Sequence, residues 1–407
     1  MYNRSIARTK RRFGKKKEIQ MEKLYYQFPY VKEFEAEVLS CSEGKKGYEI
    51  MLNRTAFYPE GGGQPSDCGS LGGVRVLEVK EKNGDIIHVT DGPLTEGSTV
   101  KGIVDWEIRF ANTQQHSGEH IVSGLIHRRF GYDNVGFHMG REEVTLDLNG
   151  SITWEQLMEI EKEANQVVYA NLPVRIYYPT QEELKVLDYR SKKELTGEVR
   201  IVEYPGADVC ACCGTHVERT GEIGAIKFLS LMNYKGGVRI SMLCGEKAME
   251  DYRRKTDQTL AISALLSAKP DLLTEAVERL KNEEAEKDGT IARMWRELMT
   301  LKSDRFPEGA ELLLVFEEGL SPVAVRQFCD LLMKEKKGKT VGVFSGSDAA
   351  GYSYCVGSPE RNVREDGKKL NASLNGRGGG SPQMIQGTFH ASESEIRDVF
   401  SEIYLQR

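Results

Sequence analysis

Two short strings of potential metal ligands, far apart in the sequence, constrain the fold most. They are HSGEH at residues 116–120 and CCGTH at residues 212–216, and each holds two ligand types four residues apart. Residues 111–130 read as a helix, where this spacing puts both imidazoles on one face. The second string reads as a turn that can bring a thiolate and an imidazole together. Either pair alone is more often structural, but together they make a plausible tetrahedral set for one Zn²⁺ per chain: His116, His120, Cys212 and His216.

Longer strings around both pairs carry a resemblance to a known family. NTQQHSGEH at 112–120 and CCGTHVERTGEIG at 212–224 closely resemble the two zinc-binding motifs of alanyl-tRNA synthetase editing domains. The same motifs occur in the free-standing alanyl-tRNA editing proteins of the AlaX type, and the match here is to their long form. The resemblance implies zinc ligation by these four residues and hydrolysis of wrongly aminoacylated alanine tRNA, chiefly the seryl and glycyl forms. Cys210 and Cys213 flank Cys212, so a neighbouring thiol could substitute for it.

Length and composition bound the remaining possibilities. With 407 residues the chain can form two or three domains, and no stretch approaches the roughly 20 apolar residues of a membrane span. Cysteines clustered at 210–213 suit metal binding in a reducing cytosol, so we expect a cytoplasmic protein. The net charge of −5 argues against indiscriminate coating of nucleic acid. Residues 1–20 carry eight Lys/Arg and one Glu, which predicts a disordered basic tail, arising from an upstream start or serving as an RNA-touching arm.

Residues 21–105 are predicted to form a small β-barrel-like domain that carries a glycine-rich loop. Short alternating segments are punctuated by Gly, Asn and Asp, and TAFYPEGGGQP lies between two of them at 55–65. Three successive glycines allow a ligand to approach the backbone closely. The string resembles the glycine-rich motif of the same family, which abuts the aminoacyl end of the tRNA. The resemblance implies that Thr55 selects serine against alanine. On chemical grounds, Gln64 and the backbone N–H groups of Gly61, Gly62 and Gly63 are candidates to hold the water or the oxyanion.

Residues 106–245 are predicted to form the α+β zinc-binding editing domain. A helix from Thr153 to Ala170 has a capping signal, because Gln156 stands three residues after Thr153. Two further strands, at 223–231 and 237–243, would carry Arg239 near the ligands as a substrate-binding residue.

Residues 246–305 read as a helical spacer, and residues 306–407 as an α/β domain with alternating strands and helices. The spacer has apolar residues at alternating steps of three and four, consistent with packing on its own domain or with a dimer seam. The string NGRGGGSP at 375–382 resembles a glycine-rich loop of the C-terminal domain of alanyl-tRNA synthetases and DHH phosphoesterases. The resemblance implies tRNA contact by Arg377, Gly378 and Gly379, and a homodimer formed by the spacer or this domain.

The whole pattern predicts a multidomain protein of mixed α+β and α/β class that edits mischarged tRNA in trans. The expected reaction is ATP-independent hydrolysis of an ester, with zinc either saturated and orienting the substrate or opened to acidify a water. A non-catalytic zinc-stabilised tRNA-binding module is the main alternative, and a small-molecule metallohydrolase is a third. The Asp-His-His motif of the phosphoesterases is absent, so their chemistry is not expected.

Overall fold

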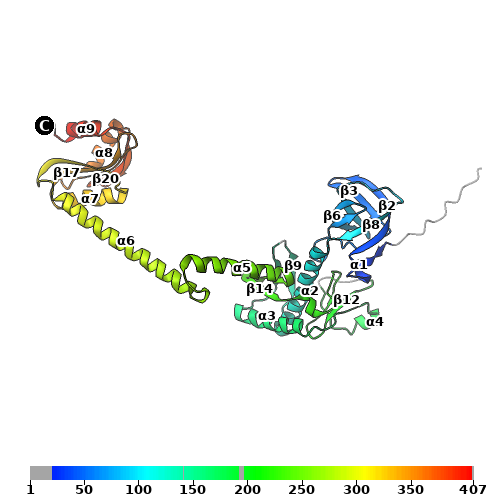
Figure 1. Ribbon diagram of the computed structural model, residues 1–407. Coiled ribbons are helices and arrows are strands. Elements are labelled where there is room, and N and C mark those ends of the chain that lie inside the picture. The colour runs from blue at the N-terminus through cyan, green and yellow to red at the C-terminus, as the bar shows by residue number, and fades with distance from the viewer. Residues whose placement is uncertain (1–20, 141, 192–196, 406–407) are drawn as a thin grey trace, which may run out of the picture. The chain divides into compact units, whose positions relative to one another are not determined.

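The computed structural model describes residues 21–140, 142–191 and 197–405, and the chain divides into two compact units (Figure 1). The first unit is Met1–Ala261 and the second is Ile262–Arg407. Sheets and helices are present in both units, so the predicted mixed α/β multidomain architecture is confirmed. The basic segment 1–20, and with it the expected disordered tail, lies outside the described residues. No helix within the described ranges is long and apolar enough to cross a membrane.

Six antiparallel strands at the start of the first unit pair in a closed ring, in the order β2-β3-β7-β6-β5-β8. Alternate residues of β2 and β8 are buried, which places one face of each strand on a common apolar core. The turn between β6 and β7 has positive φ at Asn83 and Gly84, as a tight two-residue hairpin requires. The strands are β2 (Glu33–Gly44), β3 (Gly47–Leu52), β5 (Gly69–Leu71), β6 (Val74–Lys82), β7 (Asp85–Thr90) and β8 (Thr99–Val104).

Two long helices and a four-stranded antiparallel sheet form the rest of the first unit's core. The helices are α2 (Trp106–Phe130) and α3 (Trp154–Tyr169), and the expected capping box is present, with Thr153 and Gln156 bonding reciprocally. The sheet order is β14-β15-β10-β9, and a separate three-stranded sheet has the order β11-β12-β13. The strands are β9 (Asn134–Met139), β10 (Val144–Leu148), β11 (Arg175–Tyr177), β12 (Ile201–Tyr204), β13 (Asp208–Ala211), β14 (Ile226–Tyr234) and β15 (Gly237–Cys244).

Short elements complete the first unit. Strand β1 (Glu22–Lys23) pairs in parallel with β4 (Arg54–Thr55), and the one-turn helix α1 (Leu24–Gln27) follows β1 directly. Helix α4 (Gln181–Leu184) is also a single turn, and helix α5 (Gly245–Leu266) begins directly after β15.

A long helix and a five-stranded sheet make up the second unit. Helix α6 (Leu273–Ser303) precedes a sheet ordered β16-β17-β18-β20-β19, in which only the β16–β17 pair is parallel and α7 connects the two. Separate apolar clusters lie against α7 and against α8 with α9. The other elements are β16 (Ala310–Glu317), α7 (Pro322–Lys334), β17 (Gly338–Ser347), β18 (Gly351–Gly357), α8 (Val363–Ser373), β19 (Arg377–Gly380), β20 (Met384–Phe389) and α9 (Glu393–Leu405).

The glycine-rich string of the second unit corrects one expectation. We expected a flexible loop, but Arg377–Gly380 forms the edge strand β19, paired with β20. A Cβ atom at Gly378 would lie 2.4 Å from the backbone oxygen of Gln386 and 2.4 Å from the hydroxyl of Tyr354. The absence of a side chain therefore lets this strand pack closely, rather than making it mobile.

Candidate metal centre

The two ligand strings come together in the first unit. One donor atom from each of His116, His120, Cys212 and His216 lies within 4.8 Å of all the others. The Nε2 atom of His116 is 3.4 Å from the sulfur of Cys212. Tetrahedral zinc with ordinary Zn–N and Zn–S bonds would separate such a pair by about 3.5 Å. The spacing of this pair therefore suits one shared ion without rearrangement.

Glycines let the backbone close around this centre. Gly118 lies between the two histidines of α2, and a Cβ atom there would be 2.3 Å from the sulfur of Cys244 on β15. Gly214 passes the ring of His116, where a Cβ would lie 2.1 Å from Cε1. Its backbone N–H also donates to the sulfur of Cys212 at 3.3 Å. Both glycines are thus required by close approach, which explains their place inside the two strings.

Each imidazole is fixed through Nδ1, which leaves its Nε2 directed at the centre. Nδ1 of His116 lies 2.9 Å from Oε1 of Gln64. Nδ1 of His120 lies 2.8 Å from Oδ2 of Asp208. Nδ1 of His216 lies 2.9 Å from the hydroxyl of Tyr204. The Nε2 atoms of His120 and His216 are buried and have no hydrogen-bond partner among the described residues. Buried polar atoms without partners are costly, and this outer set of contacts is typical of metal-bound histidines. The residues therefore fit a bound metal ion.

Charges around the centre favour the ligand forms of its side chains. Burial raises the pKa of the Cys212 thiol, but electrostatic interaction with the imidazoles of His116, His216 and His120 outweighs burial and holds that pKa well below its ordinary value. Burial lowers the pKa of His216 to about 3, so this imidazole is neutral. A thiolate and a neutral imidazole are the forms that bind zinc.

A buried carboxylate holds the second histidine of α2. Asp208 bonds His120 and also accepts from Arg190, with Nε to Oδ1 and Nη2 to Oδ2 both at 2.8 Å. Burial opposes protonation of His120, but the Cys212 thiolate and Asp208 outweigh it and keep the pKa of His120 well above the ordinary value. A metal ion would therefore have to displace this proton as it binds.

The neighbouring cysteines occupy different positions from Cys212. Cys213 is exposed and does not belong to the group of four. Cys210 is buried and belongs to a second group with His120 and Asp208, whose carboxylate is already bonded to both His120 and Arg190. The geometry thus groups Cys212 with the three imidazoles.

Gln64 links the glycine-rich loop to the ligands. Gly61 and Gln64 exchange both backbone hydrogen bonds, and Gly62 and Gly63 between them have positive φ, which defines a tight hairpin. The Gln64 side chain is fully buried; its Oε1 accepts from the Thr215 backbone N–H at 3.1 Å and its Nε2 donates to the Thr215 hydroxyl at 2.9 Å. The backbone donor fixes which amide atom is oxygen. His116 Nδ1 must therefore be the donor to Gln64, and His116 Nε2 faces the sulfur of Cys212.

A second buried contact braces the same loop from the helix. Arg109 on α2 and Asp67 form a fully buried ion pair, with Nε of Arg109 2.8 Å from each carboxylate oxygen. Asp67 also accepts from the backbone N–H of Tyr58, and Arg109 donates to the backbone oxygen of Ala56. The start of the loop is therefore tied to the helix that carries two ligands.

The structure places Thr55 inside the barrel core. Its side chain is fully buried and its hydroxyl is 2.8 Å from Nε2 of His88. Nδ1 of His88 lies 3.1 Å from the backbone oxygen of Ile50, to which it donates, and burial lowers the pKa of His88 to about 4. His88 is therefore neutral and accepts a hydrogen bond from Thr55. The hydroxyl that we expected to select serine is engaged within the protein.

The remaining predicted site residues make contacts within their own units. Arg239, predicted as a substrate-binding residue, pairs with Asp147 at 2.6 and 2.8 Å and lies 3.8 Å over the ring of Tyr234. Its neighbours Val238 and Ile240 point into the core, and the alternation of β15 turns Arg239 to the other face. Arg377, Gly378 and Gly379 are exposed on β19 of the second unit.

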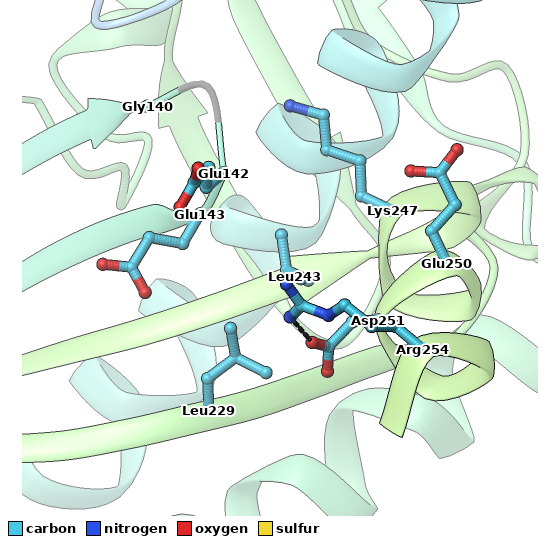
Figure 2. A pocket seen from close by; sticks show the side chains of 9 residues that line it. All are labelled: Gly140, Glu142, Glu143, Leu229, Leu243, Lys247, Glu250, Asp251 and Arg254. Atoms are coloured by element: carbon cyan, nitrogen blue, oxygen red, sulfur yellow. Dashed lines mark hydrogen bonds and ion pairs between the residues drawn. The ribbon is translucent and has the colours of Figure 1, made fainter. Parts of the chain in front are cut away.

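Among the hollows of the first unit, two differ in what lines them. One adjoins the metal centre and is lined by Tyr26, Arg200 and Cys213, among others. The other lies between the sheet and α5 (Figure 2). Leu229 and Leu243 form part of its lining, and charged side chains surround them, including the paired Asp251 and Arg254. None of the four ligands is among the described residues that line this second hollow.

Two family models of tRNA synthetases match parts of the chain that carry the barrel and part of the ligand set. Residues 199–241 match the family described as the threonyl and alanyl tRNA synthetase second additional domain, and residues 3–108 match class II (A) tRNA synthetases.

Comparison with whole proteins gives the family. The chain is 30% identical over 399 residues to the alanyl-tRNA editing protein AlaX-L of Pyrococcus horikoshii, covering 94% of this chain and 98% of the relative. It is 29% identical to Aarsd1, an alanyl-tRNA editing protein of Mus musculus, over 88% of this chain and 92% of the relative. A 33% identical alanine–tRNA ligase of Halorubrum lacusprofundi is matched over 90% of this chain but only 42% of the relative. The chain belongs to the alanyl-tRNA editing proteins.

Proposed function

We propose that this protein hydrolyses the ester that joins a wrong amino acid, serine or glycine, to the 3′ end of alanine tRNA, and that it uses one zinc ion. The observation that carries the proposal is the buried set of three imidazoles and one thiolate, in which two Nε2 atoms have no partner within the described residues. Kinship with proteins named for alanyl-tRNA editing supports the substrate.

The ligands would hold zinc, and zinc would supply positive charge that orients the aminoacyl end or polarises its carbonyl. The surrounding residues would fix the ligands. Gln64 sets the tautomer of His116, and Asp208 with Arg190 anchors His120. Tyr204 orients His216. Four protein ligands fill a tetrahedral site, which favours orientation of the substrate over acidification of a water.

The glycine-rich loop would supply the contacts to the reacting ester. Its hairpin tip, Gly62 and Gly63, offers backbone N–H groups for the carbonyl oxygen as negative charge develops on it. Because the Gln64 amide already bonds His116 and Thr215, we assign it to ligand positioning ahead of water activation. Thr55 would select serine by exchanging its bond to His88 for one to the serine hydroxyl, which alanine cannot replace.

The other parts of the chain would bind and assemble the complex. We propose that a spacer (246–305) and a C-terminal domain (306–407) follow the barrel domain (21–105) and the editing domain (106–245). The spacer and the C-terminal domain would bind tRNA or pair two copies of the protein. Helix α6 supports the dimer, because a row of its apolar side chains is 41–65% exposed: Val277, Leu280, Ile291, Met294, Leu298 and Leu301. Exposed Arg377 on β19, next to glycines, supports phosphate contact.

Release of serine from seryl-tRNA(Ala) tests the proposal directly. We expect release with the intact protein, its loss after treatment with a zinc chelator, and its recovery when Zn²⁺ is restored. Correctly charged alanyl-tRNA(Ala) serves as the control substrate and should be hydrolysed far more slowly. Tight binding of the tRNA without release would support a non-catalytic module held together by zinc. Chelator-insensitive release would remove zinc from the mechanism.

A further inference from the structure

A hollow lies next to the metal centre. Its volume is about 920 Å³, at the upper end of the roughly 300–1,000 Å³ typical of ligand pockets. Three of the four metal ligands are almost fully buried, and only Cys212 is partly exposed. The next residue, Cys213, is exposed and lines the hollow. The hollow therefore begins on the side where the centre is least covered.

A buried arginine in this hollow has unused hydrogen-bonding capacity. Arg200 is only 6% exposed, and its Nη1 donates to the backbone oxygens of Cys212 at 2.8 Å and Gly214 at 3.2 Å. Among the described residues its hydrogen bonds go to these two carbonyl groups, and its Nε is buried without a partner. Carbonyl groups accept hydrogen bonds from a guanidinium but carry no charge that would form an ion pair with it. Arg200 therefore offers an anion or a π system a binding position next to the metal.

Aromatic side chains accompany this arginine. The Arg200 guanidinium lies 5.1 Å from the ring centroid of Tyr26, which is partly exposed and lines the same hollow. Tyr178 also lines it and is 48% exposed. Tyr25, adjacent to Tyr26 with ring centroids 4.5 Å apart, has a buried hydroxyl without a partner in the described part of the chain. An arginine stacked on a tyrosine is a typical platform for a nucleobase.

The charges around the platform limit which kind of ligand can bind there. Lys23 pairs with Glu81 at 2.8 Å, so this lining pair is neutral. Glu22 and Glu198 also line the hollow and leave it without an excess of positive charge. A run of several phosphates would be repelled. A single nucleotide fits better, because carboxylates accept hydrogen bonds from a base amino group or from ribose hydroxyls.

We propose that this hollow binds the terminal nucleotide of an RNA 3′ end, with its base stacked on Tyr26 and its phosphate at Arg200. This assignment rests on the proposed function, since the ester to be cleaved is carried by that nucleotide. The platform positions the ribose next to the metal centre; it does not take part in the bond cleavage. Tyr26 and Arg200 are accordingly positioning residues.

The test measures binding of the oligonucleotide CCA to the full chain, and to Tyr26→Leu, by calorimetry. The second ligand is the same oligonucleotide without its terminal base. We expect Tyr26→Leu to weaken CCA binding about tenfold, the scale of one base stacked on an aromatic ring, and to leave binding of the abasic oligonucleotide unchanged. Bound zinc should stay at the wild-type level. Tyr169→Leu, which removes a 77% exposed tyrosine at the end of α3, is the matched control.

Other outcomes separate this inference from the proposed function. If Tyr26→Leu weakens CCA and the abasic oligonucleotide equally, or neither, the base does not stack there and the inference is wrong. The KM for seryl-tRNA(Ala) should rise in Tyr26→Leu with little change in kcat. Arg200→Lys provides a second variant, expected to weaken both oligonucleotides because each keeps the terminal phosphate. A chain that shows the base-dependent loss but releases no serine would refute the deacylase proposal alone.

Discussion

Replacing Gln64 by alanine tests whether the glycine-rich loop holds the metal centre together. The substitution removes the acceptor of His116 Nδ1 and of the Thr215 N–H, both buried. Removing a partner of a metal-bound histidine typically lowers metal affinity about 10- to 100-fold, equivalent to roughly 1.4–2.8 kcal/mol. Two buried donors left without partners cost about 1–3 kcal/mol each. We therefore expect weaker zinc binding and a less stable fold in Gln64→Ala.

The measurement is the zinc dissociation constant, obtained by competition with a chromophoric chelator, together with kcat for release of serine. Gln64→Glu keeps an acceptor for both donors, although it loses the donor to the Thr215 hydroxyl and places a carboxyl group in a buried position. It should therefore retain more zinc affinity than Gln64→Ala. Gln166→Ala, exposed on α3, is the control. If Gln64→Ala binds zinc like the wild type while kcat falls strongly, Gln64 acts on the water or oxyanion and our assignment to ligand positioning is refuted.

Three further predictions concern the ligands, the selectivity residue and the second unit. Cys212→Ala should abolish stoichiometric zinc and serine release together, by elemental analysis and deacylation assay; retained zinc would assign the ligand to a neighbouring cysteine. Thr55→Val should reduce the ratio of seryl- to alanyl-tRNA hydrolysis and, because the buried His88 loses its donor, lower the free energy of unfolding by about 1–3 kcal/mol; an unchanged ratio contradicts the selectivity argument. Deleting 306–407 should weaken tRNA binding, by filter assay, more than it slows the chemical step; unaltered affinity would leave that domain to dimerisation.

The ligand strings could be read from the sequence because their geometry is local. Residues four apart on a helix face the same way wherever the helix lies, and a cysteine–histidine turn folds back on itself. The contacts that orient the ligands depend instead on distant pairing. Asp208 begins an ordinary short strand, Tyr204 ends another, and Gln64 is 52 positions away from His116 in sequence. No periodicity connects such residues.

One signal for the missing contacts was nevertheless present in α2. A stretch of seven of its residues, from 112 to 118, consists of polar residues and one glycine, and all of them are buried. A helix with polar side chains on every face lacks the apolar stripe of an ordinary surface helix, so its polar groups need partners from elsewhere in the fold. The glycine string of β19 lacks such a signal, because glycine alone does not distinguish a mobile loop from a close-packed edge strand.

The polar network around α2 couples the metal centre to the barrel. Thr113 donates to the backbone oxygen of Arg109 at 3.0 Å, so its hydroxyl accepts from Thr215, 2.7 Å away, which in turn accepts from Gln64. Arg109 continues the connection through Asp67 to the start of the glycine-rich loop. In this series of hydrogen bonds the donor of each bond is fixed, and all of the side chains involved are buried. Displacing a metal ligand should therefore also shift the glycine-rich loop, because the hydrogen bonds connect the two. We expect loss of zinc and loss of the geometry of the loop that would face the ester to occur together.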